Sequence, residues 1–190
     1  MSREFLAFDD TSKIAEGDLL SVAEQIKQYI EDQGDRLIVI FDKHTSRVTD
    51  VYLQGSAADT EAWVRAHVPD ALPQPQKGRG RPKLGVVSRE ITLLPRQWDW
   101  LSSQPGGASV TLRRLVDAAT KDPAAERRAA QDATYRFATA VAGDAPGFEE
   151  AIRALYANQS EAFADLISQW PVDVKQHTAA LAATCWFDPA

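Results

Sequence analysis

The chain of 190 residues contains a single cysteine, Cys185, and a single methionine. One cysteine excludes an internal disulfide framework. No apolar run approaches the roughly 20 residues that a membrane helix needs, so we expect no membrane partner. The first residues carry acidic side chains where a secretory signal has its apolar core, so we also expect no signal peptide and a cytoplasmic location.

The sequence also lacks a recognisable catalytic or metal-binding set. His44, His67 and His177 fall in three different predicted elements, and none has a cysteine or a second histidine at metal-ligand spacing. Cys185 has no neighbouring base, which favours a buried, inert thiol over a nucleophile. We therefore expect no enzymatic activity, no cofactor and no metal.

Charge is distributed unevenly along a chain whose formal net charge is -6. Residues 1–76 contain 7 basic and 14 acidic side chains, residues 77–121 contain 9 and 3, and residues 122–190 contain 5 and 10. A basic centre between acidic flanks can bind an external polyanion such as a nucleic acid. It can equally dock on its own acidic neighbours, and charge alone does not separate the two interpretations.

Periodicity predicts an α+β protein with a small N-terminal domain over residues 1–68, in the order ββαββα. We expect Ser21 and Glu24 to form a capping box for its first helix, and Gly34 to end that helix. The expected strands cover 4–10, 12–18, 36–42 and 48–53, and the second helix covers 59–68.

Three further parts follow. Residues 69–85 form a Pro/Gly-rich basic linker, residues 86–122 a strand-helix-helix unit, and residues 123–190 an all-helical C-terminal region. In the third part, Pro95 suits a first helical position and Ser109 can cap the second helix. The apolar stripe of that second helix consists of Leu112, Leu115, Val116 and Ala119.

The linker contains a basic motif that resembles the core of an AT-hook, Arg-Gly-Arg-Pro flanked by cations. The glycine lets an extended backbone enter a narrow minor groove, and arginine prefers the negative potential of A·T tracts. The proline keeps the chain extended, and the lysines can reach phosphates. The glycine spacing fits neither the dinucleotide nor the Walker pattern. The residues concerned are Lys77, Arg79, Gly80, Arg81, Pro82 and Lys83.

Residues 86–122 resemble a ribbon-helix-helix unit, whose strand pairs with that of a second subunit. The resemblance implies a homodimer through residues 86–94, base contacts by outward strand residues, and phosphate contacts near Ser109. We include Arg89, Arg113 and Arg114 among the expected DNA-binding residues. Glu90 departs from the pattern if the strand presents it to the groove. The alternative is a strand that joins a sheet, followed by two packing helices.

Most of the chain resembles a bacterial family catalogued as domain of unknown function 2239, particularly through "LLPRQWDWLSSQPGGAS". The resemblance implies a bacterial cytosolic protein and carries no established activity. From the residues we expect a DNA-binding protein, a transcriptional regulator or nucleoid-architectural protein, that contacts AT-rich minor grooves. The alternative is a protein-interaction or adaptor module whose basic linker packs on its own acidic domains. RNA ranks below DNA because the sequence shows no stacked-aromatic RNA-reading module.

Overall fold

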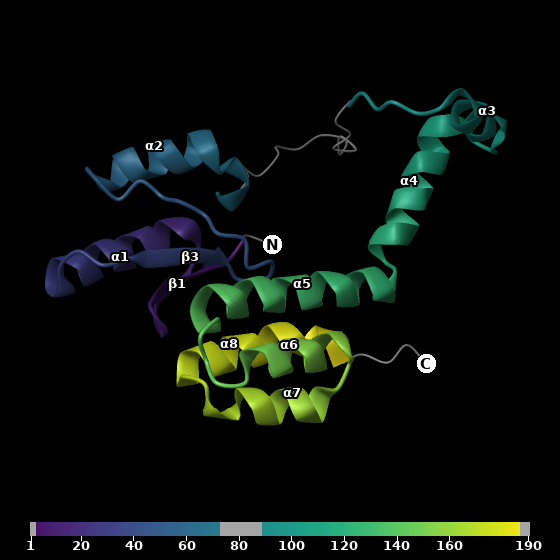
Figure 1. Cartoon of the computed structure of the whole chain (residues 1–190). Coiled ribbons are helices and arrows are strands. Elements are labelled where there is room, and N and C mark those ends of the chain that lie inside the picture. The colour runs from purple at the N-terminus through teal and green to yellow at the C-terminus, as the bar shows by residue number, and fades with distance from the viewer. Residues whose placement is uncertain (1–2, 73–88, 187–190) are drawn as a thin grey trace. The chain divides into compact units, whose positions relative to one another are not determined.

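A computed structural model describes residues 3–72 and 89–186. The chain divides into two compact units, which we describe separately. Unit 1 comprises Met1–Gln74 and Glu126–Ala190, and unit 2 comprises Pro75–Ala125. The described residues contain a three-stranded antiparallel sheet and α1 to α8 (Figure 1), so the predicted α+β class is confirmed.

The sheet of unit 1 has β1 (Phe5–Asp9) at its centre, between β2 (Ser12–Gly17) and β3 (Ile38–Asp42). Both neighbours run antiparallel to β1. β1 and β2 form a hairpin whose register shifts between Ala7 and Phe8. The short turn at Asp10 has a φ of 53°, a left-handed conformation that aspartate tolerates better than most residues.

Helices cover both faces of this sheet (Figure 1). Because side chains alternate along a strand, Phe5 and Ala7 point to one hydrophobic core, and Leu6 and Phe8 point to another. The first core contains residues of α1 (Leu19–Gln33) and α2 (Ala57–His67). The second contains residues of α5 (Pro123–Ala142), α6 (Phe148–Tyr156), α7 (Ser160–Leu166) and α8 (Val172–Ala182). A strand buried on both faces explains the nearly continuous apolar sequence of β1.

The second core joins the two ends of the chain. Phe8 and Phe41 from the sheet meet Phe137 of α5 edge to face, with centroid distances of 5.1 Å and 5.3 Å to the Phe137 ring. Such tilted geometry is the favoured one for aromatic pairs. Residues 1–68 and 123–190, expected from the sequence as separate parts, contribute side chains to this one core.

The first helix begins earlier than the capping-box pattern predicted. Its N-cap is Asp18, whose side chain accepts hydrogen bonds from the amides of Leu20 and Ser21. Ser21 therefore lies inside the helix, and the expected box between Ser21 and Glu24 is wrong. The predicted end is confirmed, because Gly34 is the C-cap with a φ of 79°.

The segment 48–53, expected as a strand, forms no strand in the structure. It makes an isolated bridge between Val48 and Phe41, and the amide of Thr49 donates a hydrogen bond to the carbonyl oxygen of Ile40. Val51 and Leu53 still pack against the first core, so the alternation was read correctly but ladder pairing is missing. α2 then begins with a true capping box between Ser56 and Asp59. Short 3₁₀ turns complete unit 1 at Pro69–Ala71, Ile167–Gln169 and Ala183–Trp186.

The described part of unit 2 is a helical hairpin. α3 (Pro95–Ser103) begins with Pro95 at its first position, as predicted. α4 (Gly107–Thr120) has Gly106 as its N-cap in a left-handed conformation, so the predicted cap at Ser109 is wrong. Residues 89–94 precede α3 without a paired strand. A ribbon would need the strand of a second chain, so the dimeric ribbon stays a prediction.

Candidate functional site

The AT-hook-like motif, residues 77–83, lies outside the described residues. Of the predicted DNA-binding residues, the structure describes Arg89, Ser109, Arg113 and Arg114, all of them exposed and all in unit 2. Arg89 lies in the segment before α3, and the other three lie on α4. The structure therefore brings Ser109, Arg113 and Arg114 together on one helix.

The first turn of α4 carries a small polar cluster. The side chain of Arg113 donates from Nε to the carbonyl oxygen of Ser109 at 3.1 Å and from a terminal nitrogen to the Ser109 hydroxyl at 3.5 Å. No side chain caps this helix. The positive end of the helix dipole and the guanidinium of Arg113 thus lie close together, an arrangement that favours an anion nearby.

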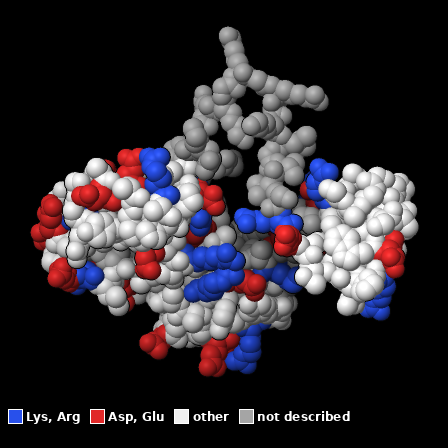
Figure 2. Space-filling model, turned by 90° about the horizontal axis from the view of Figure 1, so that it is seen from above, with Lys and Arg blue, Asp and Glu red and all other residues white. Residues whose placement is uncertain are grey.

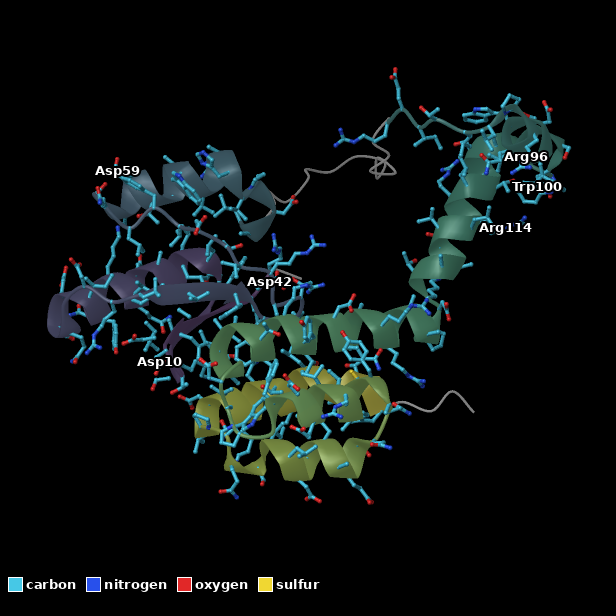
Figure 3. The ribbon with its side chains drawn as sticks, viewed as in Figure 1. Asp10, Asp42, Asp59, Arg96, Trp100 and Arg114 are labelled. Atoms are coloured by element: carbon cyan, nitrogen blue, oxygen red, sulfur yellow. The ribbon has the colours of Figure 1, made fainter. Side chains whose placement is uncertain are left out.

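The arginines of the hairpin have no carboxylate partner within the described part of the hairpin itself. This holds for Arg89, Arg96, Arg113 and Arg114. In unit 1, by contrast, Arg3, Arg65 and Arg153 each form an ion pair with an acid. Figure 3 labels Arg96 on α3 and Arg114 on α4. Arginine is always charged, so an exposed guanidinium without an acidic neighbour has a charge that an external anion can neutralise.

The hairpin also exposes an apolar groove, which we call the α3–α4 groove. Its volume is about 410 Å³, and Trp100 and Leu115 in its wall are 51% and 46% exposed. Leu115 belongs to the apolar stripe that the sequence predicts for this helix. The residues that line the groove are Leu93, Arg96, Gln97, Trp100, Leu101, Leu112 and Leu115.

Unit 1 contains a larger, mixed-charge pocket of about 680 Å³ between the turn after β3 and helices α5 and α8. Arg47 and Arg136 line it together with Glu126 and Asp132. Arg136 donates a hydrogen bond to the carbonyl oxygen of Thr45. Both signs of charge are present, so the lining does not select a ligand by charge. Figure 2 shows lysine and arginine side chains next to acidic ones on the visible face.

His177, a half-buried residue of the pocket lining, and the buried Cys185 both have pKa values shifted by burial. Burial lowers the pKa of His177 to about 4, so its ring is neutral at physiological pH. Burial raises the pKa of the Cys185 thiol to about 11, as expected for a structural cysteine and not a nucleophile.

No group of three or more metal-binding side chains gathers anywhere in residues 3–72 or 89–186. None of the helices in those ranges combines the length and the apolar composition that a membrane span requires.

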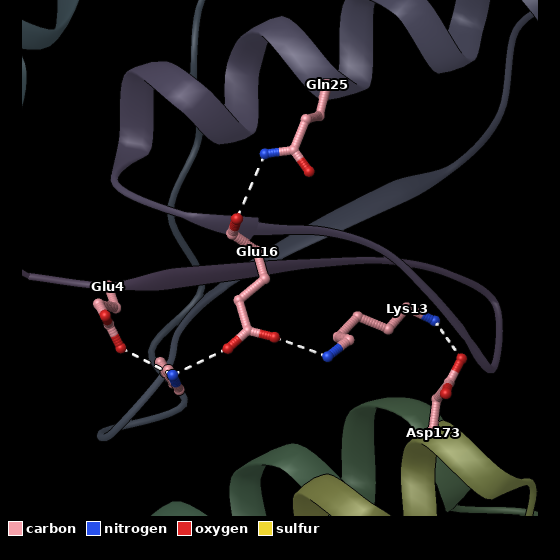
Figure 4. A network of polar contacts seen from close by, with 6 residues as sticks. Glu4, Lys13, Glu16, Gln25 and Asp173 are labelled. Atoms are coloured by element: carbon pink, nitrogen blue, oxygen red, sulfur yellow. Dashed lines mark hydrogen bonds and ion pairs between the residues drawn. The ribbon is translucent and has the colours of Figure 1, made fainter.

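An ionic network fixes the β-hairpin of unit 1 (Figure 4). The carboxylate of Glu16 contacts Lys13 at 2.6 Å and Lys43 at 2.8 Å, and Lys43 also contacts Glu4 at 2.7 Å. The backbone amide of Lys13 donates to Asp173 at the start of α8. These contacts link β2 to the turn after β3 and to the C-terminal helix, which indicates a structural role.

Asp42, the last residue of β3, organises the turn that follows this strand. One carboxylate oxygen accepts from the amides of His44 and Thr45 and from the Thr45 hydroxyl, and the other pairs with Arg3. Burial alone would raise the pKa of Asp42, but the hydrogen bonds from Thr45 and the charge of Arg3 outweigh it and lower the pKa. The carboxylate is thereby held charged as a structural acceptor.

The fold and these sites define an α+β protein with an arginine-bearing helical hairpin and no recognisable catalytic set in the described residues. The chain belongs to a family described as uncharacterized protein conserved in bacteria (DUF2239), whose model matches residues 4–182. The resemblance noted from the sequence is thus confirmed at the level of the family. No curated protein and no solved structure matches the chain.

Proposed function

We propose that this protein binds DNA, as a cytoplasmic, nucleoid-associated regulator or architectural protein. The AT-hook-like motif would enter AT-rich minor grooves, and the arginines of the hairpin would contact phosphates. The observation that carries the proposal is that no carboxylate of the described hairpin, residues 89–122, pairs with Arg89, Arg96, Arg113 or Arg114.

The first turn of α4 supports a phosphate contact. Arg113 lies against Ser109 there, at the end of the helix that favours negative charge. Arg114, one position further, is exposed and available to the backbone of a duplex. Phosphate contacts of this kind position a protein on DNA without reading sequence, whereas preference for A·T tracts would come from the motif in the linker.

A titration of AT-rich and GC-rich duplexes by electrophoretic mobility shift tests the proposal. We expect tighter binding to AT-rich DNA and a steep loss of affinity with salt, because each neutralised phosphate contributes about 0.9 to the slope of log K against log salt. Arg79→Ala/Arg81→Ala should weaken binding, flatten that slope by roughly 2 and remove the AT preference. The charge-matched control is Arg65→Ala/Arg153→Ala, two arginines already paired with acids in unit 1. Equal effects of the two double variants, or no effect of the first, would disprove the motif's role.

The second candidate function is a protein-interaction module, and the α3–α4 groove favours it. A pull-down that recovers one stoichiometric protein after nuclease treatment would support this function. Phe163 and Trp170 of the C-terminal region do not contribute to such a surface, because both are buried in the core of unit 1.

A further inference from the structure

The hairpin of unit 2 has almost no core of its own. Among its described residues, 89–122, only Leu101 and Thr111 are buried. Helices of 9 and 14 residues are marginal in water unless an apolar face is packed. A helix normally buries its apolar stripe against another element. We therefore expect a further protein surface to pack on the apolar side chains of this hairpin.

Several large apolar side chains of the hairpin are exposed, and two of them, Trp100 and Leu115, line the α3–α4 groove. Trp100, Leu115 and Val116 are 51%, 46% and 57% exposed, and Ile91 and Leu94 before α3 are 51% and 53% exposed. Aromatic side chains bury roughly 150–250 Å². With the aliphatic residues counted at the lower end of that range, these five half-exposed side chains together offer on the order of 400 Å² of apolar area. A standard interface buries about 800 Å² per partner, a little over half of it apolar. The surface therefore approaches what a stable dimer needs. In Figure 2 the visible face of the hairpin is mostly uncharged.

Unit 1 has no comparable surface among its described residues. Its exposed large apolar side chains are dispersed over different elements, and its remaining apolar side chains fill two cores. The exposed ones are Leu37, Val48, Tyr52, Tyr135, Tyr156 and Val172.

We propose that a second copy of this chain docks on the α3–α4 groove, with the two α4 helices antiparallel about a two-fold axis beside Leu115 and Val116. This symmetry places Leu112 of one copy opposite Ala119 of the other, a large side chain against a small one, and Leu115 opposite Val116. Large-against-small pairing lets helices approach closely. A two-fold contact repeats each favourable pair twice, and such dimers are the commonest oligomers.

The polar groups around the groove fit this assignment. The helical spacing of α4 places Arg113, Arg114 and Asp117 outside the apolar stripe, so the centre of the contact holds no α4 charge. Arg96 and Trp100 belong to the residue types that are enriched in interfaces. The contact leaves Arg113 and Arg114 outward and does not depend on DNA binding.

Sedimentation velocity of the full chain over a wide concentration range tests the proposal. The wild-type protein should dimerise reversibly, and Leu115→Glu should raise the dimer dissociation constant by about 30-fold or more, the effect of losing an interface hot spot. The matched control is Val172→Glu on α8, an apolar side chain in unit 1 that is 61% exposed. This variant should leave the dimer unchanged.

A mixing experiment tests the two-fold arrangement itself. Val116→Lys alone should also dissociate the dimer, but an equimolar mixture with Leu115→Glu should form a heterodimer, because the new carboxylate and ammonium groups face one another. Restored dimerisation excludes simple misfolding of either variant. A wild-type chain that stays monomeric at every concentration, while Leu115→Glu only lowers its melting temperature, would show that the groove is covered within one chain and would overturn the proposal. Dimers that form normally in both single variants would also overturn it.

Discussion

The carboxylate of Glu16 lies between the ammonium groups of Lys13 and Lys43, and its pKa falls to about 2 as a result. The same contacts raise the pKa of Lys43, and the largest cause is the hydrogen bond that its ammonium group donates to the Glu16 carboxylate. Exposed ion pairs usually contribute little. Here three acids and two lysines are linked in one network, and the backbone of Lys13 also bonds to Asp173 of α8.

Replacement Glu16→Gln should therefore lower the free energy of unfolding by about 1 kcal/mol near neutral pH, a value kept small because water screens a side chain that is 38% exposed. A carboxyl group with a lowered pKa in the fold stabilises the protein above its unfolded value of 4.5, and this stabilisation is lost as the pH falls toward about 2. Urea unfolding of both proteins at about pH 7 and about pH 3 measures the difference, which should shrink at the lower pH. The control Glu61→Gln removes an isolated, exposed pair with Arg65 and should change stability by under about 0.5 kcal/mol at either pH. A Glu16 effect that stays constant with pH would contradict the network.

Helix ends show where local sequence patterns succeed and where they fail. Gly34 was predicted to end α1, and it does so, because few other residues adopt the required positive φ. The pattern Ser21-x-x-Glu24 looks like a capping box, yet Asp18 begins the helix three residues earlier. Asp18 and Ser21 are both residue types that cap helices, so local sequence does not decide which of them begins α1. The helix begins at Asp18, and Leu19 is then helical and buried in the first core.

Asp18→Ala should accordingly lower the free energy of unfolding by about 1 kcal/mol, because it removes the acceptor for the amides of Leu20 and Ser21. Ser21→Ala is the matched control. Its exposed hydroxyl accepts only from the Gln25 side chain among the described residues, and its loss should change stability by under about 0.5 kcal/mol. Chemical denaturation of the two variants distinguishes them. A larger loss for Ser21→Ala than for Asp18→Ala would restore the cap that the sequence predicted.

The candidate site was predictable in its residue types and less so in its surroundings. The stripe of α4 placed Arg113 and Arg114 on the outside, and both are exposed. The exposure of Leu115 and Val116 could not be foreseen, because a stripe shows which face needs burial and not what covers it. A further signal was present in the composition: a short segment with two tryptophans and several leucines holds more apolar surface than two helices can bury. The motif at 79–82 rests on sequence alone.

The core shared by the N-terminal sheet and the C-terminal helices could not be predicted from the sequence either. Contacts between residues far apart in the chain leave no local periodicity. β1 is buried on both faces, and that double burial is what connects α1 and α2 to the helices near the C-terminus. Residues 3–72 and 126–186 should therefore unfold as one cooperative unit in spite of the segment that separates them. Both segments that flank the basic centre, residues 77–121, therefore belong to unit 1.

Phe137→Leu tests this cooperativity, because Phe137 contacts Phe8 and Phe41 across the join between the two parts. Its side chain is fully buried, so the smaller residue should lower the free energy of unfolding by about 1–2 kcal/mol. Native-state hydrogen exchange of the full chain should show equal losses of protection for core amides in β1 and in α6, since one opening exposes both. Tyr135→Leu on the same helix is the control, and it should leave protection nearly unchanged because the Tyr135 side chain is 42% exposed. If Phe137→Leu reduced protection in α6 while β1 kept its own, the two parts would unfold independently and the shared core would not determine the stability of unit 1.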